Sequence, residues 1–145
     1  MNLRFIPLLL CLGLCSMAVA DGSSGTVLEP PAVVLPPEVH EIAPEQVERQ
    51  LVDHPETLII DVRTEEERRT RGFILNSLHY DHFHGQKTLD ALAKLDKTKP
   101  CIVYCAIGGR AQLIAVEMHK LGFKKILLLK GGFNAWTASG QAVAK

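Results

Sequence analysis

A single short segment of the chain combines a thiol, two glycines and a guanidinium. Cys105 ends an apolar run, and Gly108 and Gly109 stand shortly before Arg110. Glycines let successive backbone N–H groups converge on one point, and a helix that starts beside them adds its positive end. A thiol at such a point is favoured as the thiolate, which is the nucleophilic form, and the arginine supplies a fork for an oxyanion. The segment therefore predicts Cys105 as a nucleophile beside an anion-binding nest, with Arg110 as the fork that binds the anion.

The elements that position this segment are predicted from apolar runs and from helix start and stop signals. Strands are expected over residues 57–61, 77–80, 101–104 and 126–129, and helices over 44–53, from 64, and over 88–95, 110–121 and 133–138. Thr64 followed by three glutamates is typical of a helix start, and Gly122 of a helix end. Alternating strands and helices predict an α/β fold, a small parallel β-sheet flanked by helices on both faces. Ligands of such sheets bind beyond the carboxyl ends of the strands, which is where Cys105 stands.

The composition fits one folded domain and excludes some partners. The chain has 145 residues, of which 47% are hydrophobic and 22% charged, so it can bury a core. Sixteen Lys and Arg balance sixteen Asp and Glu, which argues against binding of nucleic acid through a broad basic surface. Residues 21–41 are rich in Gly, Ser and Pro and are expected to be a linker, with a strand or a peptide ligand as the alternative. The folded domain is then expected over residues 42–145.

The first twenty residues have the features of a secretory signal peptide. Arg4 is followed by an apolar run of about ten residues and by small residues up to Ala20. This run is too short for a membrane span, which needs roughly 20 residues. We expect cleavage near Ala20 and a secreted or periplasmic mature form that is not held in a membrane. Lipidation at Cys11 or Cys15 is disfavoured because leucine precedes each of them.

Removal of residues 1–20 leaves two cysteines, Cys101 and Cys105. Two are too few for a small fold that depends on disulfides. Residues four apart in a strand have Cα atoms about 13 Å from each other, which is beyond the reach of a disulfide. We therefore expect two free thiols, with Cys101 inside its strand. The structural alternative for Cys105 is a buried cysteine at a tight turn, but the glycines and Arg110 together favour a functional role.

At this point the chain resembles a known family, the single rhodanese domain, over residues 42–143. The resemblance rests on the active-site loop YCAIGGRA and on four other segments: residues 42–45, 60–63, 121–123 and 129–136. It implies a sulfurtransferase in which Cys105, as catalytic residue, takes a sulfane sulfur from a small anionic donor such as thiosulfate and holds it as a persulfide. It also implies that the main chain of five substrate-binding residues surrounds the transferred sulfur and the sulfonate end of the donor: Ala106, Ile107, Gly108, Gly109 and Arg110. The sulfur then passes to a thiophilic acceptor, which is cyanide or a thiol, including a thiol of a protein. Neither a metal nor an organic cofactor is required.

Two other functions stay open at this point. One is a persulfide carrier without turnover, or a redox-partner binding module; the intact Cys105 favours the enzyme, because non-catalytic members of the family commonly lose it. The other is a phosphatase-like hydrolase. Related phosphatases and arsenate reductases have one residue more between cysteine and arginine than the loop from Cys105 to Arg110. A tighter ring suits a single sulfur atom better than a phosphate.

Other polar residues invite a functional interpretation that we do not favour. His79, His82 and His84 are close in sequence, but no cysteine or carboxylate is placed to complete a metal site. We expect surface positions for them, with His82 or His84 at the rim of the cysteine pocket as the alternative. Asp61 and Arg63 flank a strand end and are expected to have a structural role, as an ion pair or as a cap of a nearby loop, rather than to bind substrate.

Overall fold

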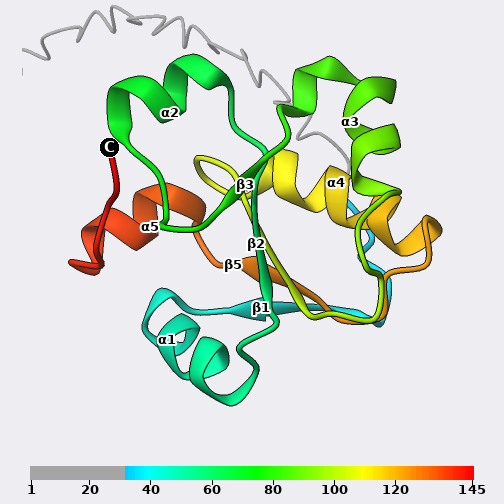
Figure 1. Ribbon diagram of the computed structural model, residues 1–145, viewed down its shortest axis with the longest axis horizontal. Helices are drawn as coiled ribbons and strands as arrows, with labels where there is room; N and C mark the ends of the chain where they lie inside the picture. Colours follow the sequence, from blue (N-terminus) through cyan, green and yellow to red (C-terminus); the bar gives the residue numbers. More distant parts are fainter. Residues whose placement is uncertain (1–31) are drawn as a thin grey trace, which may run out of the picture. The chain divides into compact units, whose positions relative to one another are not determined.

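A five-stranded parallel sheet forms the centre of residues 32–145, the part of the chain that the computed structural model describes (Figure 1). Its strands lie in the order β1-β5-β4-β2-β3, and all neighbours run parallel. The strands are β1 (Val39–Ile42), β2 (Leu58–Asp61), β3 (Leu78–His79), β4 (Cys101–Tyr104) and β5 (Ile126–Leu129). The helices are α1 (Pro44–Asp53), α2 (Glu65–Arg71), α3 (Gln86–Leu92), α4 (Gly109–Lys120) and α5 (Gly132–Ala138), with a 3-10 turn η1 (His82–His84). The predicted α/β fold is confirmed.

Helices cover both faces of the sheet, because successive side chains of each strand point to opposite sides. In β4, Cys101 and Val103 belong to the core that the sheet forms with α3 and α4. Ile102 and Tyr104 belong to the core that it forms with α1 and α5. Continuing this alternation, Cys105 lies on the side of α3 and α4. The cysteine therefore lies at the carboxyl end of β4, on the face of the sheet that α4 covers and close to the start of α4.

Local sequence features set where helices α2 and α4 begin. At the start of α2, the Thr64 hydroxyl accepts from the Glu67 backbone N–H at 3.1 Å. The Glu67 carboxylate in turn accepts from the Thr64 N–H at 3.0 Å, which completes a capping box. At the start of α4, Gly108 has φ of 121°, a conformation that favours glycine. Helix α4 thus begins at Gly109, one residue before the expected start.

Strand β1 begins inside the segment that the sequence assigned to a linker. It pairs with β5 along its whole length, so residues 39–41 are part of the sheet. Only Val39 and Ile42 are buried, and the two residues between them are exposed. No apolar run therefore marks this strand in the sequence. For residues 39–41 the linker interpretation is wrong, and the strand alternative is correct.

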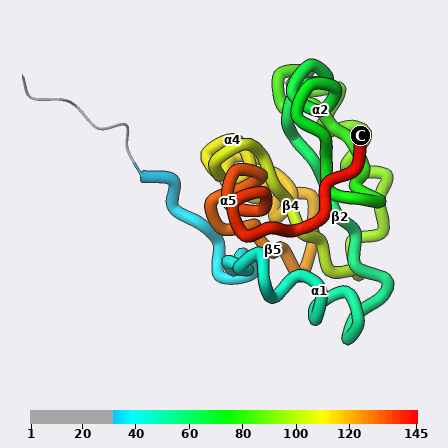
Figure 2. The backbone as a smooth tube through the Cα atoms, turned by 90° about the vertical axis from the view of Figure 1, so that its left-hand side faces the viewer, coloured from blue at the N-terminus to red at the C-terminus, as the bar shows by residue number. Residues whose placement is uncertain are grey.

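The structure describes the carboxyl end of the chain but not its first 31 residues. The expected signal peptide, residues 1–20, and the expected linker up to residue 31 lie outside the described residues. At the other end, the chain returns to the end of α2 (Figure 2), where Phe73 and Ala144 form an antiparallel bridge. None of the helices between residues 32 and 145 is long and apolar enough to cross a membrane.

Candidate active site around Cys105

Cys105 directly follows β4, which lies between β5 and β2 in the sheet. The residue is only 1% exposed and its thiol is free. The Gly108 backbone N–H donates to the Cys105 Sγ at 3.1 Å, so the loop curls back over the sulfur as its glycines predicted. The positive end of α4 lies next to this contact, because α4 starts at the following residue. The sulfur is therefore held where backbone dipoles favour negative charge.

The start of α5 fixes the outer side of the loop. The carbonyl of Cys105 accepts from the Phe133 N–H at 2.8 Å, and the carbonyl of Ala106 accepts from the Asn134 N–H at 3.0 Å. Gly132 makes this approach possible: a Cβ at this position would lie 2.5 Å from the Cys105 carbonyl oxygen. Because both carbonyls point to α5, they do not point at the Cys105 sulfur, which instead accepts from the Gly108 N–H.

Arg110 lies beside Cys105, but its fork is already occupied. Its Nη1 and Nη2 donate to the two carboxylate oxygens of Glu67, both at 2.7 Å. The hydrogen bond from Arg110 lowers the pKa of Glu67 to about 2. The pKa of Arg110 is raised, chiefly by the same hydrogen bond and to a smaller degree by Cys105. The expectation that Arg110 offers its fork to a substrate anion is therefore incomplete, since nothing in the sequence indicates that Glu67 binds this guanidinium.

A largely buried network around Asp61, Arg63 and Tyr104 holds the end of β4 in place. Asp61 and Arg63 form the expected ion pair, with 2.8 Å between Arg63 Nη2 and Asp61 Oδ2. The same carboxylate oxygen accepts from Arg68 Nη1 at 3.0 Å and from the Tyr104 hydroxyl at 2.8 Å. Burial raises the pKa of Tyr104 to about 12, so its hydroxyl remains a donor. Because Tyr104 immediately precedes Cys105, this network positions the nucleophile.

The three histidines do not form one cluster, because His79 lies in β3 and the other two in η1. His79 lies between the Glu65 carboxylate, at 3.2 Å, and the Arg63 carbonyl, at 2.8 Å. His82 and His84 belong to η1. Between residues 32 and 145 no group of three or more His, Cys, Asp or Glu is placed to hold a metal ion.

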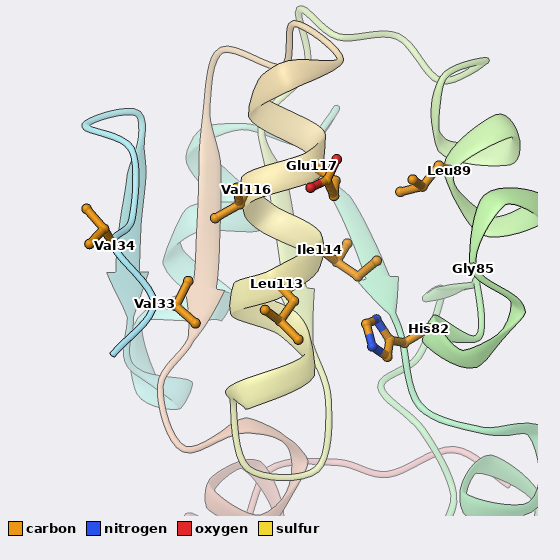
Figure 3. Close-up of a pocket in the computed structure, with 9 residues that line it drawn as sticks. All are labelled: Val33, Val34, His82, Gly85, Leu89, Leu113, Ile114, Val116 and Glu117. Carbon is orange, nitrogen blue, oxygen red and sulfur yellow. The ribbon is translucent and has the colours of Figure 1, made fainter. Parts of the chain in front are cut away.

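His82 lines an apolar hollow on the side of α4 (Figure 3). The hollow has a volume of about 360 Å³, and its apolar lining includes Val33, Leu89, Leu113 and Ile114. The side chain of η1 that lies beside Arg110 is Phe83, whose ring centre is 5.7 Å from the guanidinium carbon. Because Phe83 lies beside Arg110 and is 70% exposed, it forms part of the rim of the site, and no pattern in the sequence marks it for this role.

Cys101 is as deeply buried as Cys105 but has different surroundings. It lies within β4, and burial raises its pKa to about 12. At pH 8 only about one molecule in ten thousand then carries a Cys101 thiolate, the form that reacts. The two cysteines should therefore differ in reactivity although both are shielded.

Iodoacetamide at pH 8 is expected to modify Cys105 at least about tenfold faster than Cys101, because Cys101 is almost never a thiolate. Peptide mapping by mass spectrometry of the folded protein measures the two rates. The same reagent in denaturant should label both cysteines equally, which controls for detection. Equal labelling of both in the folded protein would contradict the burial of Cys101 in β4.

Comparison with known proteins agrees with this geometry. A family model described as a rhodanese-like domain matches residues 43–139. The chain is 35% identical over 89 residues to the thiosulfate sulfurtransferase GlpE of Coxiella burnetii, covering 61% of this chain and 79% of that protein. It is 35% identical over 101 residues to the dual specificity phosphatase Cdc25 of Arabidopsis thaliana, covering 63% and 68%. The solved polysulfide-sulfur transferase homodimer of Wolinella succinogenes superimposes with a TM-score of 0.61 at 29% identity, covering 73% and 78%.

These relatives confirm the resemblance that the loop and its flanking motifs indicated. Two of them are named as sulfurtransferases and one as a phosphatase. The family match covers more than half of the chain and includes β4, the Cys105 loop and α5. The chain belongs to the rhodanese-like domain family.

Proposed function

We propose that this protein is a sulfurtransferase in which Cys105 carries a sulfane sulfur as a persulfide. The observation that carries the proposal is the Gly108 N–H, which points at the Cys105 sulfur from 3.1 Å. A persulfide places its negative charge on the outer sulfur, and converging backbone N–H groups stabilise such a charge. The loop is also tight and shielded, with Cys105 1% exposed, which suits one added sulfur atom.

The reaction proceeds in two displacements at sulfur. In the first, the Cys105 thiolate attacks the sulfane sulfur of a donor such as thiosulfate, and the donor's S–S bond breaks. Sulfite leaves with the electron pair, and Cys105 becomes a persulfide anion. In the second, cyanide or another thiophile attacks the outer sulfur, thiocyanate leaves in the case of cyanide, and the thiolate returns. The backbone of Ala106, Ile107, Gly108 and Gly109 surrounds the transferred sulfur, and no redox partner is consumed.

We also propose that the chemistry takes place after export, because the amino-terminal segment has the composition of a signal peptide. A secreted or periplasmic site of action places the two cysteines in an oxidising compartment. The intervening β4 separates Cys101 from Cys105, which supports two thiols that do not pair within one molecule. Cyanide, small thiols and a thiol of a partner protein are the acceptors that fit this chemistry.

The test is to incubate the purified protein with thiosulfate and cyanide and to follow thiocyanate. Without cyanide, the peptide containing Cys105 is expected to gain the mass of one sulfur atom. With cyanide, thiocyanate is expected to form over many turnovers. A mass gain without turnover would show a carrier instead. Release of phosphate from an aryl phosphate, with no sulfur on Cys105, would show a phosphatase and overturn the proposal.

A further inference from the structure

Glu67 fills the place on Arg110 that an anionic donor would otherwise take. Its carboxylate is planar and bidentate on the guanidinium, the same arrangement by which an arginine fork binds an incoming oxyanion. We propose that Glu67 is a specificity-determining residue that favours sulfane-sulfur donors with one negative charge over dianionic thiosulfate. This inference rests on the function proposed above and names the donor class of the same site.

The local charges around the Cys105 loop support this selection. From Ala106 to Gly109 the loop contributes no charged side chain, so Arg110 is its only cation. The ion pair with Glu67 makes the sum of the two side chains zero. On the outside, Ile107 is 71% exposed and Phe83 is 70% exposed, so the border that these residues form is apolar. A dianion gains little from such a border, and it also meets the charge of the Cys105 thiolate.

Glu67 is held in this position by its own helix. The Thr64 backbone N–H and hydroxyl both donate to Glu67 Oε2, at 3.0 and 3.2 Å. The low pKa of Glu67, caused chiefly by the hydrogen bond from Arg110, keeps the carboxyl ionised throughout the neutral range. Both Thr64 contacts end on the oxygen that also accepts from Arg110 Nη1, so they hold the carboxylate against the guanidinium. A change of pH within the neutral range does not release Arg110, so a substitution is needed to test the proposal.

The size of the effect follows from the charge alone. At about 6 Å and an effective dielectric constant of about 40, one unit charge changes the rate constant of a monoanion about tenfold. A dianion feels the same charge twice, so its rate constant changes about a hundredfold. Removal of the Glu67 charge should therefore shift the preference between the two donor classes about tenfold.

The experiment compares two donors that differ by one charge in the Glu67→Gln variant. Thiosulfate is the dianion, and methanethiosulfonate, in which a methyl group replaces one charged oxygen, is the monoanion. The Cys105 thiolate attacks the sulfane sulfur of either donor, and sulfite or methanesulfinate leaves with the electron pair. Cyanide is the common acceptor, so kcat/KM for each donor reports the loading step. We expect the ratio of kcat/KM for thiosulfate to that for methanethiosulfonate to rise about tenfold in the variant.

Glutamine keeps the capping box, because its side-chain carbonyl accepts from the Thr64 N–H as the carboxylate does. The matched control is Glu66→Gln, which removes the same charge from the neighbouring position of α2. Glu66 pairs with Arg69 on the exposed side and does not contact Arg110. Its ratio should stay that of the wild type. A ratio in Glu67→Gln that changes less than about twofold, or an equal change in both variants, would overturn the proposal.

A measurement on the unchanged protein tests the same inference without relying on a variant. An unpaired Arg110 would attract thiosulfate, and salt would weaken that attraction. With Arg110 neutralised by Glu67, kcat/KM for thiosulfate should not fall as ionic strength rises. A steep fall would overturn the role of Glu67 while leaving the persulfide intact. Failure of both donors to add sulfur to Cys105 would instead overturn the proposed function.

Discussion

Thiocyanate formation is expected to fall at least about a thousandfold when Cys105 is replaced by serine. A serine hydroxyl is not ionised near neutral pH, and its oxygen cannot hold a sulfane sulfur as a persulfide does. Serine differs from cysteine by one atom and can still accept from the Gly108 N–H, so the loop is expected to keep its shape. The measurements are the rate of thiocyanate release and the mass of the peptide after incubation with thiosulfate.

The matched control for this substitution is Cys101→Ala. Cys101 is the other cysteine of the described residues and lies at the opposite end of β4, away from the loop. Its removal is expected to leave the rate within about twofold of the wild type. Persistence of turnover in Cys105→Ser, or its loss in Cys101→Ala, would show that the nucleophile has been assigned to the wrong thiol.

The substitution Asp61→Asn is expected to destabilise the fold by about 3–5 kcal/mol, because it leaves a buried arginine without its counter-charge. Asp61 Oδ2 accepts hydrogen bonds from Arg63, Arg68 and Tyr104. Asp61 Oδ1 accepts two more, from the backbone N–H and the Nε of Arg63. An asparagine must turn its NH₂ group toward one of these sets of donors, so several hydrogen bonds are lost in either orientation.

Urea unfolding at neutral pH measures this loss as a lower midpoint with an unchanged slope. Glu66→Gln is again the matched control, since it breaks an ion pair whose two side chains are 69% and 68% exposed. Its cost should stay within about 0.5 kcal/mol. A loss below about 1 kcal/mol for Asp61→Asn would mean that water or another group satisfies Arg63.

Much of the fold follows from the sequence because strands β2, β4 and β5 are apolar runs. Strand β1 has no such apolar run, since its two central residues, His40 and Glu41, are exposed. It becomes a strand only because β5 offers an unpaired edge, and pairing across more than 80 positions of sequence leaves no local signal. A domain that begins at residue 42 therefore leaves out the first three residues of β1.

In the site, too, features that depend on local sequence were predictable, and a contact between distant residues was not. The Cys105 loop was predictable, because its thiol, two glycines and arginine lie within six successive residues and the glycines have a local conformational reason. The contact of Arg110 with Glu67 joins residues 43 positions apart. In the sequence, Glu67 is one of three glutamates at a helix start, and its spacing from Thr64 marks it as the capping-box residue. Nothing local indicates that it also pairs with Arg110; only the tertiary fold brings Arg110 to Glu67.

The attachment of the Cys105 loop to α5 has a consequence for when the cysteine becomes competent. The carbonyls of Cys105 and Ala106 are held by N–H groups of Phe133 and Asn134, which are synthesised well after the loop itself. A nascent or truncated chain that ends before α5 contains the thiol but lacks the anchor that shapes its surroundings. The surroundings that fit Cys105 for sulfur transfer are therefore complete only when the last helix has docked, so the function of the loop depends on a segment that follows it in the chain.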